Sequence, residues 1–166
     1  STMFSSDGRP RNSWGTADFL IMFRSDSKSG IYRTRSDLED SGFRLNTAME
    51  FRADALKYVP VYEAKLIHQF DHRYASYVTV ENQATRMSES DTRVLGSDDK
   101  TQVDVAEPRY WVAESEVSSI FAGRNWISEW VVGYRDVTNA SNERTAIGSM
   151  LPRSGSAQPL NLLVGV

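Results

Sequence analysis

The chain has 166 residues and a net charge of −3, with 40% hydrophobic and 25% charged residues. This length suits one domain with an ordinary core, and the composition gives no sign of disorder or of a strongly basic nucleic-acid-binding surface. The sequence has no cysteine, which excludes disulfides and thiolate sites and favours a cytoplasmic location. The apolar runs are too short to cross a membrane, and the opening residues lack a secretory-signal pattern.

The first half of the chain is predicted to form short strands and one short helix. Residues 1–16 read as a tail, and the predicted strands lie at 17–23, 31–35, 58–67 and 73–82. Pro60 predicts that the third strand is an edge strand or an entry strand, since proline cannot donate to a ladder. Ser36 and Glu39 form the pattern of a capping box, so we expect a helix that begins there and ends near Gly42.

The second half begins with a polar stretch, residues 83–107, which has no hydrophobic period and predicts a long loop. Residues 108–123 predict a brief strand and then a helix with Ile120 and Phe121 facing inward. A strand is expected at 126–138 and another at 159–166. Between them, Ser141 or Asn142 is expected to cap a helix that ends near Pro152.

The irregular order of strands and helices favours an α+β fold over a doubly wound α/β fold. We expect a single mixed domain over residues 17–166, with short strands, short helices and a long polar loop near the middle. A division into two lobes, 17–82 and 105–166, joined by the polar loop 83–104, is a second arrangement that fits the pattern.

The stretch YEAKLIHQFDHRY, residues 62–74, contains both histidines of the chain. On a helix, His68 and His72 would share one face with Asp71 nearby, which is a spacing that zinc proteases use. Those enzymes need a glutamate directly after the first histidine, and Gln69 stands there instead. Two hydrogen-bonding histidines are therefore favoured over a metal site.

Glu63 and Lys65 match the second half of a metal-dependent nuclease centre, in which Glu63 would hold a divalent cation. Such a centre also needs an aspartate on a neighbouring strand. Asp54 is too close in the sequence, and Asp26 lies in a turn-like segment. This reading therefore stays an alternative.

Two segments concentrate arginine beside Asn, Gln, His and Thr, the side chains that contact bases and phosphates. They are KLIHQFDHRY, residues 65–74, and GYRDVTNASNERTAIGSMLPR, residues 133–153. Arginine is also the dominant cation of the chain, at 15 of 19 basic residues. Solvated helix ends with internal ion pairs would produce the same composition, so the residues alone leave both explanations open.

The same two segments, in this order, resemble the C-terminal region of large N6-adenine-specific DNA methyltransferases of restriction-modification and phage-defence systems. The resemblance rests on VPVYEAKLIHQFDHRYASY, PRYWV and GYRDVTNASNERTAIGSMLPR, and on the upstream SDSKSGIYRTRSDLEDSG. It covers most of the chain from about Phe19 onward. It implies a target-recognition domain, which grips duplex DNA and selects the sequence whose adenine is flipped.

The family's catalytic half carries an Asn-Pro-Pro motif and a glycine-rich loop for S-adenosylmethionine, and neither is present in this chain. The resemblance therefore implies a recognition module that is inactive alone and holds no cofactor, beside a catalytic methyltransferase domain of the parent that binds S-adenosylmethionine. Duplex DNA, that catalytic domain and other defence subunits are the expected partners; a membrane is not expected.

The resemblance assigns DNA contacts and supporting roles within the two segments. The expected DNA-binding residues are Lys65, His68, Gln69, His72, Arg73, Arg135, Asn139, Asn142, Arg144 and Arg153. Residues expected to support them are Glu63, Asp71, Asp136 and Glu143. Residues shared by enzymes with different target sequences should hold the DNA backbone or join the catalytic half. The residues that select the target DNA sequence are therefore expected in Arg86–Lys100 or Ser25–Arg35.

A rival from another class is a structural module that packs on the methyltransferase or a defence subunit and reads no DNA. A concave basic face would favour DNA, whereas an exposed aromatic patch would favour a protein partner.

Overall fold

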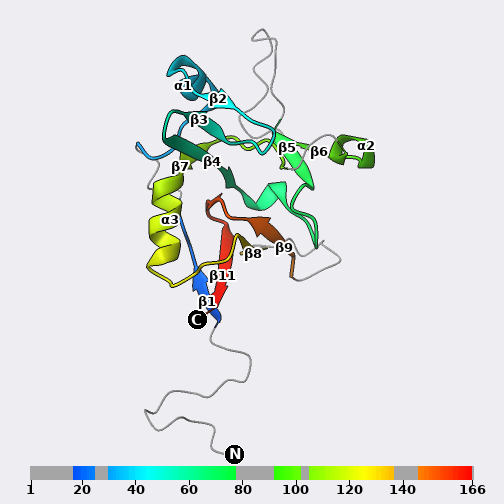
Figure 1. The fold of residues 1–166 in the computed structure, drawn as a ribbon. Helices are drawn as coiled ribbons and strands as arrows, with labels where there is room; N and C mark the ends of the chain where they lie inside the picture. Colours follow the sequence, from blue (N-terminus) through cyan, green and yellow to red (C-terminus); the bar gives the residue numbers. More distant parts are fainter. Residues whose placement is uncertain (1–16, 25–29, 78–91, 102–104, 137–145, 166) are drawn as a thin grey trace, which may run out of the picture.

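The computed structural model describes residues 17–24, 30–77, 92–101, 105–136 and 146–165 (Figure 1). Within these stretches it has eleven strands, three short α-helices and one 3-10 helix. The strands pair mostly antiparallel, and the helices are scattered between them. The predicted α+β class, a single domain of short strands and short helices, is confirmed.

The first sheet contains four antiparallel strands in the order β1-β11-β8-β9. These are β1 (Ala17–Leu20), β11 (Leu160–Gly165), β8 (Trp130–Arg135) and β9 (Gly148–Pro152). Because side chains alternate between the two faces of a strand, one face places Leu20, Val131 and Leu162 in the core. The opposite face carries one paired row across all four strands. We call this row, Phe19, Leu163, Val132 and Met150, the outer face.

The second sheet is built around β4, and its other strands are short. Its strands are β2 (Arg44–Leu45), β3 (Phe51–Ala53), β4 (Leu56–Tyr62), β7 (Trp111–Ala113) and β10 (Gly155–Ser156). Tyr58 pairs with both β3 and β7, so β4 is an interior strand and the predicted edge position is wrong. Pro60 is tolerated because the Val61 N–H donates toward β7, which leaves the proline nitrogen facing the side where β3 has already ended.

Strands from both halves of the chain share these sheets. β1 pairs with β11, and β4 pairs with β7 and β10. The larger core joins residues of both sheets and helix α3 (Glu114–Ala122). A smaller cluster packs Leu38 of helix α1 (Arg35–Asp40) against Phe51 and Trp111. The two predicted lobes therefore do not correspond to separate sheets.

Helix α1 (Arg35–Asp40) is capped by Thr34, two residues before the predicted cap, Ser36. Its capping box uses Thr34 and Asp37 in place of Ser36 and Glu39. The predicted strand before it is reduced to one bridge, between Arg33 and Trp111. Because Arg33 is held in the sheet, the next residue, Thr34, still has extended backbone and takes the capping position.

Helix α3 (Glu114–Ala122) follows β7 directly, as predicted. It buries Val117 and Phe121, and Ile120 packs against the core beside them. The polar segment predicted as a loop contains a strand, β6 (Thr92–Val94), and a short helix, α2 (Ser97–Lys100). β6 pairs with β5 (Ala75–Tyr77), and this small sheet and α2 lie on the side of the molecule away from α3 (Figure 1).

The helix predicted between Ser141 and Pro152 is wrong in its described part, where the chain forms β9. Ile147, Ser149 and Leu151 are buried, whereas Met150 between them is exposed. This period of two fits a strand and not a helix. Residues 141–145, which include the proposed cap, lie outside the described residues.

Candidate nucleic-acid interface

The segment HQFDHR, residues 68–73, forms a tight turn within the first of the two arginine-containing segments, residues 65–74. After β4, the chain makes the 3-10 helix η1 (Ala64–Leu66) and then turns back, with mutual backbone hydrogen bonds of 2.8 and 3.0 Å between His68 and Asp71. Phe70 lies in this turn at φ 61°, the left-handed region that favours glycine. Its side chain is 84% exposed. We call residues 67–73 the recognition turn.

The recognition turn is hydrogen-bonded to β9 through one residue of that strand, Gly148. The Phe70 N–H donates to the Gly148 carbonyl at 2.9 Å, and the Gly148 N–H donates to Oε1 of Gln69 at 3.1 Å. Both backbone polar groups of Gly148 are thus used to hold the turn. Gln69, predicted as a reader of bases, has a structural role here.

Asp71 fastens the other side of the recognition turn. Its Oδ2 accepts from Lys100 Nζ at 2.6 Å, and its Oδ1 accepts from the Arg73 backbone N–H at 2.9 Å. Burial alone would raise the pKa of Asp71, but the Lys100 hydrogen bond and the Arg73 N–H outweigh it and lower the pKa. Arg73 Nη1 in turn donates to the Lys100 carbonyl at 2.8 Å, which joins the turn to α2.

The second segment, residues 133–153, contacts the first segment at the recognition turn. Arg135, at the end of β8, donates through Nη2 to the carbonyl of Ile67, the first residue of the recognition turn. Burial lowers the pKa of Arg135. The Asp136 N–H donates to the Pro159 carbonyl at 2.9 Å, and its side chain is exposed. Residues far apart in the sequence, in β8, at Gly148 and at 67–73, are therefore brought together.

The two histidines do not share a helical face, because residues 67–73 form a turn. The His68 ring lies against Tyr74, with ring centroids 4.7 Å apart. Within the described part of the chain, no three side chains among His, Asp and Glu gather as a set of metal ligands. The helical arrangement considered from the sequence is therefore wrong.

Glu63 and Lys65 belong to a neighbouring cluster around the ring of Tyr77. Tyr77 donates its hydroxyl to Glu63 Oε2 at 2.9 Å, and Lys65 Nζ lies 4.9 Å from the ring centroid. Arg109 Nε lies 3.6 Å from the other oxygen of Glu63. Burial, followed by the Glu63 charge, raises the pKa of Tyr77 above its usual range. Both carboxylate oxygens of Glu63 are thus engaged inside the protein.

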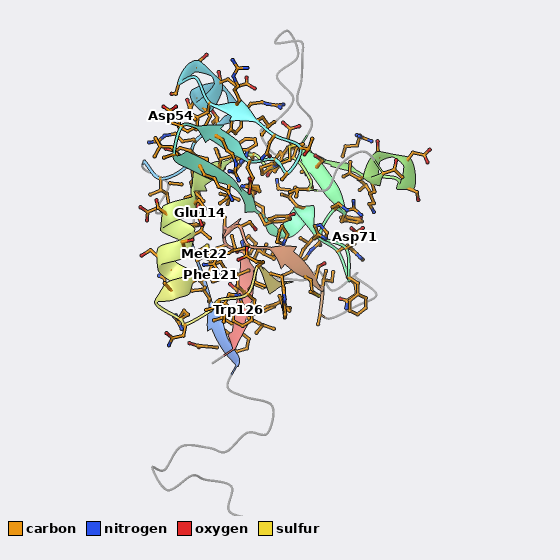
Figure 2. All side chains as sticks on the ribbon, in the orientation of Figure 1. Met22, Asp54, Asp71, Glu114, Phe121 and Trp126 are labelled. Carbon is orange, nitrogen blue, oxygen red and sulfur yellow. The ribbon has the colours of Figure 1, made fainter. Side chains whose placement is uncertain are left out.

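Arg153 lies away from the recognition turn, five residues beyond Gly148. It donates to the carbonyls of Trp126 and Ser128, both at 3.3 Å, and its guanidinium lies 4.8 Å from the Phe121 ring centroid. It also lines a polar cleft of about 380 Å³ beside α3. Figure 2 places Trp126 and Phe121 well apart from Asp71, so Arg153 does not join the cluster around the turn.

Several predicted residues lie outside the described residues. They are Asn139, Asn142, Glu143 and Arg144. The same holds for residues 86–91 and 25–29 of the two segments in which specific readers were sought. Of those segments, Arg93 forms an ion pair with Asp99 at 2.7 Å, and Arg33 donates to the Gly30 carbonyl at 2.7 Å.

Sequence reasoning missed two apolar features. One is Phe70, whose only signal was a single aromatic residue among polar neighbours in HQFDH. The other is the outer face, in which Phe19 is 65% and Met150 is 56% exposed. Its residues come from four strands, and only the register of the sheet brings them into one row.

Comparisons with models of protein families, with curated proteins and with solved structures found no match. None of the helices in the described residues is long and apolar enough to cross a membrane; α3, for instance, has nine residues. The recognition turn therefore has to be interpreted from its own geometry and from the resemblance of its motifs.

Proposed function

We propose that this chain is the DNA-binding target-recognition module of a site-specific N6-adenine DNA methyltransferase, and that the recognition turn faces duplex DNA. The observation that carries the proposal is the convergence of the two motif segments: Arg135 contacts Ile67, and Gly148 holds Gln69 and Phe70. Two segments that resemble one family in the same order, and that meet at one exposed turn, are expected to serve one shared purpose.

The proposal changes the roles of several residues. Gln69 and Arg135, expected to contact DNA, hold the backbone of the recognition turn, so we assign them to positioning; Asp71 keeps its supporting role. Lys65, His72 and Arg73 stay assigned to phosphate or base contacts, as do Asn139, Asn142 and Arg144 by resemblance. Local charge is favourable, because the turn and the side chains that fasten it include the cations Arg73, Lys100 and Arg135 beside the carboxylate of Asp71.

The first test is duplex binding by the 166-residue chain, measured by fluorescence anisotropy over a range of salt concentrations. Each lost phosphate contact should reduce the log–log salt slope by about 0.9. We expect this for Lys65→Gln and Arg73→Gln. Arg124→Gln is the matched control, because Arg124 is an exposed arginine after α3 that pairs with Asp18. Equal slopes for all three variants, with unchanged thermal unfolding, would contradict the assignment.

A second candidate function is favoured by the outer face, a row of apolar side chains that is exposed at Phe19 and Met150. Such a face suits a protein partner, for which we propose the catalytic methyltransferase domain. Sequencing of methylated sites in cells that carry the full-length parent separates the two candidates. A changed methylated sequence in Arg73→Ala would support recognition. Lost methylation in Met150→Lys, with duplex binding of the 166-residue chain unchanged, would support docking.

A further inference from the structure

We propose that Phe70 is a wedge that inserts between the stacked base pairs of bound duplex DNA. This inference rests on the proposed function and deepens it, because it names what the recognition turn does to its ligand. Phenylalanine is among the apolar side chains that proteins insert between base steps, where they partly unstack the bases and kink the duplex.

The first observation is that Phe70 is placed against two local preferences. A phenylalanine is normally driven out of water, yet this one is 84% exposed. A residue other than glycine normally avoids positive φ, yet Phe70 has φ 61°. Strained conformations persist where the surrounding structure imposes them, and they concentrate at functional sites.

The second observation is that the turn is held on three sides. His68 and Asp71 bond to each other across it, both polar groups of Gly148 hold Gln69 and Phe70, and Lys100 holds Asp71. A wedge has to keep its position against the stacking of the bases, so a fixed backbone is what insertion requires. The protein thus fixes the backbone at Phe70 while the ring stays in water.

The third observation concerns the choice between DNA and a protein partner. Phe70 is flanked by polar residues, namely Gln69 and Asp71, with His68 and His72 beyond them. Phe70 is therefore the one exposed apolar side chain of the recognition turn, whereas protein interfaces use larger apolar patches. The cations that fasten the turn, among them Arg73 and Lys100, are suited to the phosphates on either side of an opened base step.

Ile127 offers a matched control within the same chain. It is 89% exposed, like Phe70, but it lies between α3 and β8, and its φ is not among the positive values of the described residues. Exposed apolar residues that occur singly are ordinary on protein surfaces. A change at Ile127 should therefore leave DNA binding and base stacking unaffected.

The experiment uses the 166-residue chain and short duplexes that carry the fluorescent base 2-aminopurine beside a central TA step, which unstacks easily. Wild type and Ile127→Ala should raise the fluorescence, which reports unstacking. Phe70→Ala should lose this rise and weaken binding on the order of tenfold, since stacking on one base contributes about that much. Phe70→Trp should keep the rise. The salt slope should be the same in all four proteins.

The outcomes separate the two proposals. Binding of duplex DNA without a fluorescence rise, or a rise that Phe70→Ala keeps, would overturn the wedge and leave the DNA-binding module standing. Failure of the wild-type chain to bind any of the duplexes at low salt would overturn the proposed function, and the wedge with it. Folding of each variant is checked by thermal unfolding, and no loss is expected because the Phe70 ring lies in solvent.

Discussion

The recognition turn and the outer face both expose apolar side chains, but they are built in opposite ways. The outer face is a regular row across four paired strands, and its inner side contributes Leu20, Val131 and Leu162 to the core. The recognition turn presents one phenylalanine on strained backbone, fastened by polar contacts. A row of apolar side chains across a paired sheet suits docking on another surface, whereas a single exposed ring on a turn suits insertion.

The two regions also differ in the interactions that stabilise them. The sheet that carries the outer face is stabilised by its buried side, and none of the described residues in its strands has a positive φ. The recognition turn buries one apolar side chain, Ile67, and the rest of it is held by hydrogen bonds and one ion pair. Substitutions should therefore have large effects under the sheet, moderate effects around the turn and small effects on the outer face.

The largest effect is expected for Leu162→Ala, which removes a 1% exposed side chain from the core side of β11. We expect a loss of about 2–5 kcal/mol in the free energy of unfolding, from lost burial and the cavity that remains. Leu163→Ala, one residue along on the outer face, should cost clearly less. Urea denaturation measures both values. Similar losses would mean that the outer face is packed as tightly as the core.

A moderate effect is expected for Asp71→Asn, which removes the Lys100 ion pair that fastens the recognition turn. We expect a loss of about 1 kcal/mol at neutral pH, because both side chains are partly exposed. Asp54→Asn is the control, since Asp54 is an exposed carboxylate in the turn between β3 and β4 (Figure 2). An equal loss of unfolding free energy in Asp54→Asn would show that the Lys100 ion pair of Asp71 does not stabilise the protein.

The same pair makes stability depend on acid. The pKa of Asp71 is lowered in the folded protein from its ordinary value of 3.8, so the unfolded chain binds the proton more readily. Its contribution is present above pH 3.8 and is lost as the pH falls through that value toward the lower folded pKa. Between about pH 5 and pH 2, wild type should therefore lose stability more steeply than Asp71→Asn. Parallel curves would contradict the ion pair.

A comparable effect is expected at Phe70, where a glycine substitution should be the more stable one. Glycine tolerates positive φ, and alanine does not, so Phe70→Gly should be more stable than Phe70→Ala by about 1 kcal/mol. At Ile127, which lacks positive φ among the described residues, glycine should be no better than alanine. Thermal and urea unfolding of the four variants measures the difference. Equal stability of the two Phe70 variants would show that the turn relaxes in solution.

Much of the fold was predictable where one local rule acted alone. β8 and α3 follow from hydrophobic periods that the sheet and the core satisfy directly. The predictions failed where tertiary contacts decided between local alternatives. Gly148–Pro152 carries signals for the end of a helix, and pairing with β8 makes it a strand. Thr34 replaces Ser36 as the cap because Arg33 is held by Trp111.

The candidate site was predictable as a pair of segments and not as a geometry. Resemblance in sequence order singled out residues 65–74 and 133–153, and the structure shows that Arg135 and Gly148 of the second segment contact the recognition turn. The roles within the pair were not predictable, because a polar side chain that fastens a backbone looks the same in sequence as one that reads a base. The exposure of Phe70 depends on where Gly148 holds the turn, and no local pattern encodes that.

The smallest effect is expected for Met150→Lys, in the middle of the outer face. Met150 is 56% exposed, so a lysine there can keep its stem along Val132 and its charge in water. We expect the free energy of unfolding to change by less than about 0.5 kcal/mol. A loss above about 1 kcal/mol would mean that the chain covers this face itself in solution, and docking of a catalytic domain there would be contradicted. If the stability is unchanged, the module is intact and the outer face is available to a partner. Lost methylation in the Met150→Lys variant of the full-length parent would then report a broken contact between domains.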